Sequence, residues 1–221
     1  MKCTLVCSCG LLLEAEGEKL LIDGITADFP PFYPLPKADF QLILDEKPPY
    51  NDVKTLAFTH LHPDHYSSIG VRTVCEALPQ MRVQIPEGGD FQTDVFSVTY
   101  HPISHTPVVE YMMIDHYAML ISAGGKTVYV TADAEPNAEM HRKVLAGRKV
   151  DAAFWNSQHL SYAEMRKVMS ECIGKNYIYH MPADEQDKTG LCRKCQKNLE
   201  RFADELQNVT VLGQYPSNVE I

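Results

Sequence analysis

The sequence has no run of basic residues, and acidic residues outnumber basic ones. The formal net charge is −9 with the histidines neutral. Such a charge repels the phosphate backbone of a nucleic acid, so a nucleic-acid binder would need a local basic patch. The sequence has no such patch, and we therefore expect no nucleic-acid partner. An acidic balance also suits a chain whose acidic side chains bind divalent metals.

Long apolar runs are absent as well. No segment has the ~20 apolar residues that a membrane-spanning helix needs, so we expect no membrane insertion. The apolar stretch 3–13 follows a single Lys2, but no small-residue cleavage site comes after it, which argues against a secretory signal. The cysteines number seven, an odd count. The expected location is the cytoplasm, where thiols stay reduced.

The chain also lacks internal repeats and linkers, which predicts one domain over residues 1–221. Its first half is rich in β-like segments, and its second half alternates strands with helices. Residues 2–24 are typical of a β-hairpin, and Ser161–Glu164 forms a capping box expected to open a helix to about Cys172. A Gly-Gly turn at 123–126 joins two further expected strands. This order predicts an α/β domain with the sheet inside and helices outside.

The segment 26–37 is dense in proline and aromatic residues, and so many prolines prevent regular structure. We expect a loop. Such a loop suits two roles, because it can cap a substrate or form a packing or oligomer surface. Self-association stays open on the sequence.

A cluster of metal-ligand residue types follows an expected strand at 53–59. Residues 59–65 read Thr-His-Leu-His-Pro-Asp-His. His60 and His62 are two residues apart, so they point the same way on an extended backbone. Asp64 and His65 come after Pro63, which turns the chain and lets them approach from another side. Neutral imidazoles and a carboxylate suit zinc, iron or manganese. The alternative is a surface loop with chance histidines.

This pattern, His-x-His-x-Asp-His after a strand ending in Thr, resembles the signature of the metallo-β-lactamase superfamily. The resemblance continues in order along nearly the whole chain, at 20–24, 102–106, 128–133 and 178–180. It implies a four-layered αββα sandwich with the metal site at one edge of the sheets. It also implies that Asp23 supports the site from behind its ligands.

The resemblance further implies two divalent metal ions, most often zinc, with manganese or iron as alternatives. The implied ligands are His60, His62 and His105 for the first ion, Asp64, His65 and His180 for the second, and Asp133 as the bridge. His101 and His116 lie close enough in the sequence to compete with His105. Of the two, His116 is expected to face a substrate or the surface.

Two residues are candidates for proton transfer. Asp64 is expected to orient the attacking water and move its proton. His159 could donate a proton from the pocket wall, but its place ahead of the capping box also suits an ordinary residue at a helix start. His141, in a helical stretch rich in charge, is expected to be solvated.

The cysteines have simpler interpretations. Cys192-x-x-Cys195 has metal or redox spacing, but no second pair follows it. Cys3, Cys7 and Cys9 are expected on one face of the first strand as small buried hydrophobes.

The resemblance implies a metal-dependent hydrolase with a small-molecule substrate. His62 argues against the diiron electron-transfer members, which carry Glu at that position. Residues 104–108 keep only part of the glyoxalase II run His-Thr-Pro-Gly-His, which argues against that class of thioesterase. Trp155–Gln158 stands where ribonuclease Z carries His-Glu-Ala-Thr, so the proton-donating Glu of ribonuclease Z is absent. A small phosphodiester, a cyclic phosphate, or a lactone or ester is expected. The alternatives are a single-iron oxidative enzyme or thioesterase of the sulfur dioxygenase or glyoxalase II type, and a non-catalytic metal-binding domain.

Overall fold

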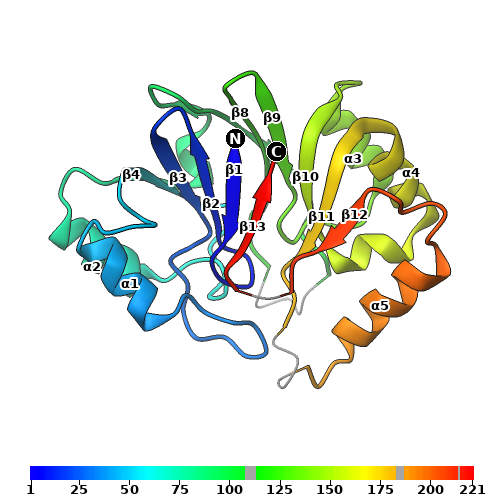
Figure 1. Cartoon of the computed structure of the whole chain (residues 1–221), viewed down its shortest axis with the longest axis horizontal. Helices are drawn as coiled ribbons and strands as arrows, with labels where there is room; N and C mark the ends of the chain where they lie inside the picture. Colours follow the sequence, from blue (N-terminus) through cyan, green and yellow to red (C-terminus); the bar gives the residue numbers. More distant parts are fainter. Residues whose placement is uncertain (108–112, 183–186, 214) are drawn as a thin grey trace.

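Two β-sheets lie face to face in the computed structural model, with helices on both outer faces (Figure 1). The structure describes residues 1–107, 113–182, 187–213 and 215–221. The strand order is β13-β1-β2-β3-β4-β5 in one sheet and β12-β11-β10-β9-β8-β7-β6 in the other. The expected four-layered αββα sandwich is therefore confirmed.

The first sheet is mixed. Its strands are β1 (Lys2–Leu5), β2 (Leu11–Ala15), β3 (Glu18–Ile22), β4 (Val53–Ala57), β5 (Arg82–Gln84) and β13 (Ser217–Glu220). The neighbours from β13 to β3 are antiparallel, whereas β3, β4 and β5 are parallel. Its outer layer is formed by α1 (Lys37–Leu44) and α2 (Ser68–Ala77).

The second sheet is antiparallel in its first part and parallel in the rest. Its strands are β6 (Phe91–Gln92), β7 (Ser97–Pro102), β8 (Tyr117–Ala123), β9 (Lys126–Val130), β10 (Val150–Asn156), β11 (Ile173–Tyr179) and β12 (Val209–Val211). Helices α3 (Ala138–Leu145), α4 (Ala163–Cys172) and α5 (Leu191–Arg201) lie on its outer side (Figure 1). Among the described residues, no helix is long and apolar enough to cross a lipid bilayer.

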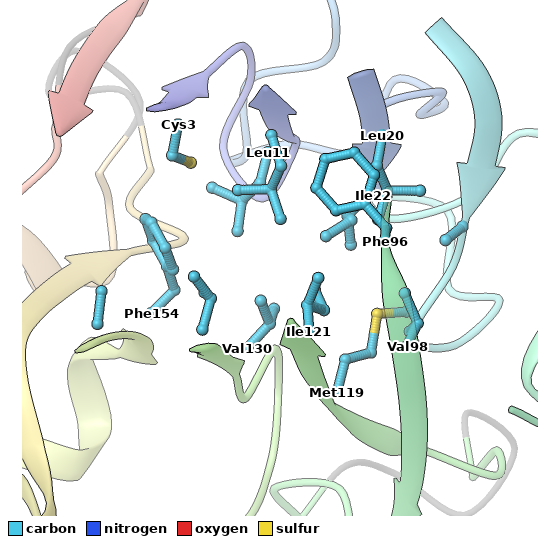
Figure 2. Close-up of a cluster of buried hydrophobic side chains, with 14 of the residues drawn as sticks. Cys3, Leu11, Leu20, Ile22, Phe96, Val98, Met119, Ile121, Val130 and Phe154 are labelled. Carbon is cyan, nitrogen blue, oxygen red and sulfur yellow. The ribbon is translucent and has the colours of Figure 1, made fainter. Parts of the chain in front are cut away.

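Alternating side chains build three cores, one between the sheets and one on the outer face of each sheet. Leu11 and Leu13 point into the core between the sheets, while Leu12 joins the core beneath α1 and α2. In the second sheet Val130 faces the central core and Tyr129 faces the helices. Figure 2 shows side chains from both sheets meeting in the central layer. The period of two along each strand therefore produces the sandwich.

The ends of parallel strands determine where polar side chains gather. β3 and β4 run parallel in one sheet, and β9, β10 and β11 run parallel in the other. The segments after all five strands leave from the same edge of the sandwich. In open α/β sheets the carboxyl ends of parallel strands are where binding sites form.

The N-terminal prediction of one hairpin is wrong. The apolar run 3–13 forms two strands, β1 and β2, which are joined by a tight turn in which Val6 N donates to Gly10 O (2.8 Å). The small residues Cys7, Ser8 and Cys9 occupy that turn. A continuous apolar run conceals it, because small apolar residues suit turns and strands alike.

Two turn predictions have different outcomes. The Gly-Gly turn is confirmed, since Gly124 and Gly125 have φ of 56° and 72° between β8 and β9. The capping box is wrong: Ser161 closes a short 3₁₀ helix, α4 starts at Ala163, and Tyr162 makes no side-chain cap. Glu164 instead pairs with Lys167 at 2.6 Å.

Truncating a central core side chain should destabilise the fold strongly. Leu20 is 0% exposed and lies between the two sheets, whereas Ile69 on α2 is 68% exposed. We expect Leu20→Ala to lower the free energy of unfolding by about 2–5 kcal/mol, because a cavity remains. Ile69→Ala should change it by less than about 0.5 kcal/mol. Denaturant unfolding measures both, and equal effects would contradict the assigned core.

Candidate metal centre

Seven side chains with metal-binding atoms meet at the edge of the sandwich. They arise from four segments that follow strands: 60–65 after β4, His105 after β7, Asp133 after β9 and His180 after β11. Two groups of ligand atoms form among these seven residues, each with all its atoms within 4.8 Å of one another, and a third group of the same kind joins Cys9 to His65 and His180. The structure therefore brings together every residue that the sequence suggested as a metal ligand.

The first group contains His60, His62, His105 and Asp133. His60 Nε2 lies 3.1 Å from His62 Nδ1. His105 Nε2 lies 3.4 Å from the Asp133 Oδ2 atom. His105 donates its Nδ1–H to the Thr106 carbonyl (2.6 Å), which leaves Nε2 as the ligand atom.

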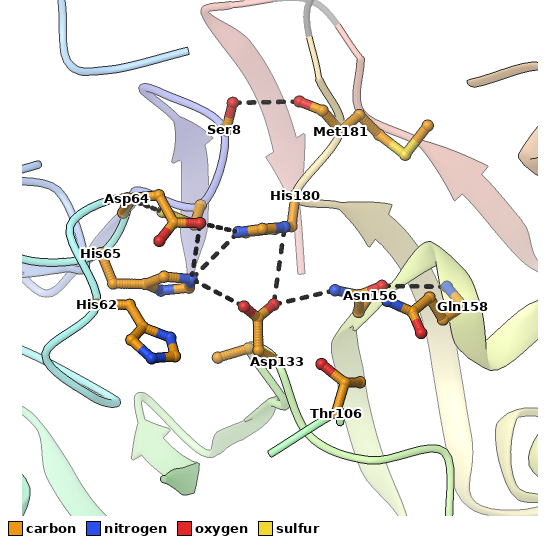
Figure 3. Close-up of polar contacts among 12 residues, drawn as sticks. Ser8, His62, Asp64, His65, Thr106, Asp133, Asn156, Gln158, His180 and Met181 are labelled. Atoms are coloured by element: carbon orange, nitrogen blue, oxygen red, sulfur yellow. Dashed lines mark hydrogen bonds and ion pairs between the residues drawn. The ribbon is translucent and has the colours of Figure 1, made fainter. Parts of the chain in front are cut away.

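The second group contains Asp64, His65, Asp133 and His180 (Figure 3). His180 Nε2 lies 3.1 Å from His65 Nε2 and 3.2 Å from Asp64 Oδ2. Asp133 belongs to both groups, and its Oδ2 lies 3.5 Å from His65 Nε2. A carboxylate in this position can bridge two cations.

The buried carboxylate of Asp23 orients two of the histidines. It accepts hydrogen bonds from Thr59 N (2.8 Å), Thr59 Oγ1 (2.6 Å) and His65 Nδ1 (2.9 Å). Because Thr59 Oγ1 donates to Asp23, it accepts from His60 Nδ1 at 3.0 Å. Both rings are thereby kept with Nδ1 protonated, and both Nε2 lone pairs face the centre.

Charge and hydrogen bonding at the centre fit bound cations. Asp23, Asp64 and Asp133 are 0%, 6% and 7% exposed, and imidazoles are their only ion-pair partners among the described residues. Burial opposes charge on His65, but the carboxylates of Asp23, Asp133 and Asp64 together outweigh it and raise the pKa of His65 well above its ordinary value. A buried cluster of carboxylates needs positive charge nearby.

The ring nitrogens of the histidines also fit a bound cation. His105 Nε2 and His180 Nδ1 are buried without a hydrogen-bond partner. The close pair His65 Nε2 and His180 Nε2 brings two nitrogen lone pairs together when both rings are neutral. A cation between such nitrogens removes that repulsion. A set of imidazoles and carboxylates of this kind suits zinc, iron or manganese.

Two residues to which the sequence analysis assigned no such role fix Asp133. Asn156 at the end of β10 donates to Asp133 Oδ1 (3.0 Å), as Figure 3 shows. His116 Nε2 accepts the Asp133 N–H (3.1 Å), and His116 Nδ1 lies 3.2 Å from the Ile103 carbonyl. Burial lowers the pKa of His116 to about 3, which keeps its ring neutral and able to accept. The expected substrate-side or surface position of His116 is therefore wrong.

Backbone geometry at the strand ends is unusual. Asp23, Ala132 and His180 have positive φ values of 48°, 45° and 58°. Each lies where a segment leaves a strand: Asp23 and His180 themselves have side chains in the centre, and Ala132 directly precedes Asp133. Left-handed backbone is uncommon outside glycine and concentrates at functional sites.

The other histidines lie outside both groups. His101 lies within β7 and is partly exposed. His141, expected in solvent, is instead fully buried and bonds to the Tyr129 hydroxyl (2.8 Å), because β9 and α3 pack face to face. His159 is buried in the 3₁₀ helix before α4, where its Nδ1 lies 3.0 Å from the Asn156 carbonyl. This position suits the helix-start interpretation, and its proton-donating role stays a prediction.

The cysteines near the N-terminus have different surroundings. Cys3 lies on β1 in the central core, as expected. Cys7 and Cys9 occupy the turn after β1 rather than one strand face, because the strand ends at Leu5. Cys9 Sγ donates to the Asp64 carbonyl (2.6 Å). The expectation that all three are only small hydrophobes on one strand is therefore wrong for Cys7 and Cys9.

The proline-rich loop 26–37 borders the centre. The Phe32 ring lies 4.2 Å from the His180 ring, measured between centroids. Phe32 also lines a hollow of about 650 Å³ that the loop forms with Phe40 and the start of α2. Lys37 and Ile69 lie on its walls. The loop therefore joins the second ligand group to a largely apolar surface.

No protein-family model and no curated protein matches the chain. Several solved structures do match the chain. A possible metal-dependent hydrolase from Veillonella parvula DSM 2008 matches with a TM-score of 0.72 and 14% identity, over 100% of this chain and 99% of its own. An isothiocyanate hydrolase from Delia radicum gut bacteria matches with a TM-score of 0.67 and 13% identity, over 100% of this chain and 99% of its own.

A metallo-β-lactamase fold protein from Bacillus subtilis also matches. Its TM-score is 0.64 at 15% identity, and the match covers 99% of this chain and 98% of that protein. The chain therefore has the metallo-β-lactamase fold, which confirms the resemblance at the level of architecture. Identities this low leave the chemistry to be argued from the site itself.

Replacing Asp23 with asparagine should invert the protonation of His65. In this variant the Thr59 N–H donates to the oxygen of the new side-chain amide, as it does to Asp23 Oδ1. The amide NH₂ therefore takes the place of Asp23 Oδ2, faces His65 Nδ1 and donates to it. The ring proton then moves to Nε2, the ligand atom. We expect Asp23→Asn to weaken metal affinity about 10- to 100-fold, as loss of an orienting partner does.

Two measurements test this expectation. Nitrogen NMR of the histidines should show the tautomer change, and chelator competition should show the weaker binding. The matched control is Asp151→Asn, because Asp151 pairs with Lys126 at the opposite edge of the sheet. Unchanged affinity in Asp23→Asn, or an equal loss in both variants, would contradict the orienting role.

Proposed function

We propose that this chain is a metal-dependent hydrolase with a two-metal centre. His60, His62 and His105 would bind the first ion, Asp64, His65 and His180 the second, and Asp133 would bridge them. The observation that carries this proposal is the pair of ligand groups with Asp133 in common. Zinc is the preferred ion for such donors, with manganese or iron as alternatives.

When bound, such ions lower the pKa of water and polarise the oxygen of the scissile bond. The protein supplies position and proton transfer. Asn156 and His116 fix the carboxylate and backbone of Asp133, and Asp23 fixes His60 and His65. These contacts keep the ligand atoms in place before the substrate arrives.

Asp64 is the group we assign to moving the proton. Its Oδ2 lies beside His180 Nε2, and its side chain is 6% exposed. A carboxylate at the edge of the centre can accept a proton from the attacking water and pass it to the leaving group. Asp64 therefore has two roles in the proposal, as ligand and as proton carrier.

The hollow beside Phe32 supports a substrate with an apolar part. Its wall is formed by Ile25, Tyr33, Leu35, Phe40 and Ile69, among others. A small carboxylic ester or lactone with an apolar substituent suits these walls, with the scissile carbonyl toward His180. A small phosphodiester or cyclic phosphate is the second candidate, since Lys37 also lines the hollow and could pair with a phosphate oxygen.

Removing the bridging carboxylate should abolish hydrolysis. We expect Asp133→Ala to lower kcat/KM by more than about 100-fold on its best ester, lactone or phosphodiester substrate, because both ions lose a ligand. Metal content should fall below that of the unaltered protein. Asp151→Ala, the same truncation at the opposite edge, should retain both. Near-normal turnover by metal-free Asp133→Ala would exclude the proposed chemistry.

A charge placed in the hollow should lower activity only on substrates with a large apolar substituent. We expect Ile69→Lys to lower kcat/KM about 10-fold for esters with a large apolar substituent and to leave the smallest ester unchanged. Tyr162→Lys serves as control, because Tyr162 is 51% exposed and precedes α4 on the other helical layer. A panel graded by substituent size measures the effect. Equal losses on all substrates would argue against the hollow as the binding surface.

A further inference from the structure

The turn between β1 and β2 is attached directly to the metal centre. Its middle residue, Ser8, accepts the His180 N–H at its carbonyl (2.8 Å). Ser8 Oγ also bonds to the Met181 carbonyl (3.1 Å), beside His180 in Figure 3. On the other side, Ser8 N donates to the Tyr33 carbonyl (3.0 Å). The turn is therefore fixed between the strand end that carries His180 and the proline-rich loop.

Cys9 in this turn lies close to two members of the second ligand group, His65 and His180. Its Sγ and the ligand nitrogens of His65 and His180 all lie within 4.8 Å of one another. The residue is 1% exposed, and its thiol donates to the Asp64 carbonyl. Part of its burial comes from the central core, but apolar packing alone does not explain a sulfur within 4.8 Å of the ligand nitrogens of two histidines.

Cys7 provides an internal comparison. It lies two residues away in the same turn and is equally buried. Its Sγ lies 3.9 Å from the Asp23 carbonyl, which Cys9 Sγ also approaches at 3.7 Å, but Cys7 belongs to no ligand group among the described residues. The two thiols thus share burial and turn geometry but differ in access to His65 and His180.

We propose that Cys9 is a further ligand of the second metal ion, beside His65 and His180. This inference rests on the proposed two-metal centre. On binding, the Cys9 S–H bond breaks, its proton leaves to the solvent, and the sulfur forms a bond to the ion. A thiolate is a soft donor, so it favours zinc over manganese or magnesium in this half of the centre.

Cobalt(II) titration of the metal-free protein tests the assignment without measuring activity. A thiolate bound to cobalt gives a charge-transfer band in the near ultraviolet, which imidazole and carboxylate ligands lack. We expect the unaltered protein to bind two cobalt ions and to develop this band with one of them. Cys9→Ser should lose the band, and Cys7→Ser should retain it.

The outcomes separate the two proposals. Two bound cobalt ions without the band, or a band that persists in Cys9→Ser, would overturn the Cys9 assignment and leave the two-metal centre intact. Failure of the unaltered protein to bind cobalt or zinc would overturn the centre itself. If Cys9→Ser does not fold, cadmium-113 NMR of the unaltered protein replaces it: a correlation between bound cadmium and the Cys9 β-protons supports the bond, and its absence excludes it.

Discussion

The buried carboxylate of Asp23 is the interaction on which the centre depends. It accepts three hydrogen bonds, two from Thr59 and one from His65, and is itself fully buried. These bonds join the end of β3 to the segment after β4. They also determine which nitrogen of His60 and of His65 faces the metal-binding atoms. Without that carboxylate, the ligand histidines would lack a fixed tautomer and the strand ends would lose a shared anchor.

The centre also depends on the packing of the two sheets. His60, His62, Asp64 and His65 follow a strand of the first sheet, whereas Asp133 and His180 follow strands of the second. The ligand groups therefore form only when the central core places the sheets face to face. Bound cations would in turn tie the sheets together, so metal binding should be coupled to folding.

Much of this arrangement was predictable because it follows from local pattern. The order of strands and helices predicted a layered α/β domain, and the family resemblance implied its four layers. The spacing of His60, His62, Asp64 and His65 indicated a metal site. His105, Asp133 and His180 came from the resemblance to a known family, and the structure brings them to the same place. What the sequence did not reveal depends on tertiary contacts. His116 and Asn156 act through single hydrogen bonds to Asp133, and no spacing rule predicts them.

The errors have both local and tertiary causes. Cys7 and Cys9 looked like strand residues, since nothing in an apolar run marks the turn after Leu5. His141 stands beside charged residues in the sequence, yet it is buried because its helix packs against β9. Ser161 begins a capping-box pattern, but the chain forms a 3₁₀ helix there first. For His141 the packing of distant segments outweighs a local preference, whereas the other two errors concern local conformations that the sequence pattern does not distinguish.

Anomalous X-ray diffraction from crystals of the metal-loaded protein tests the central claim most directly. Data collected on both sides of the absorption edge of the bound element give its identity and its position. The account predicts two peaks, one among His60, His62 and His105 and the other among Asp64, His65 and His180, with Asp133 between them. A single peak, or no peak at these residues after metal loading, would contradict the two-metal centre.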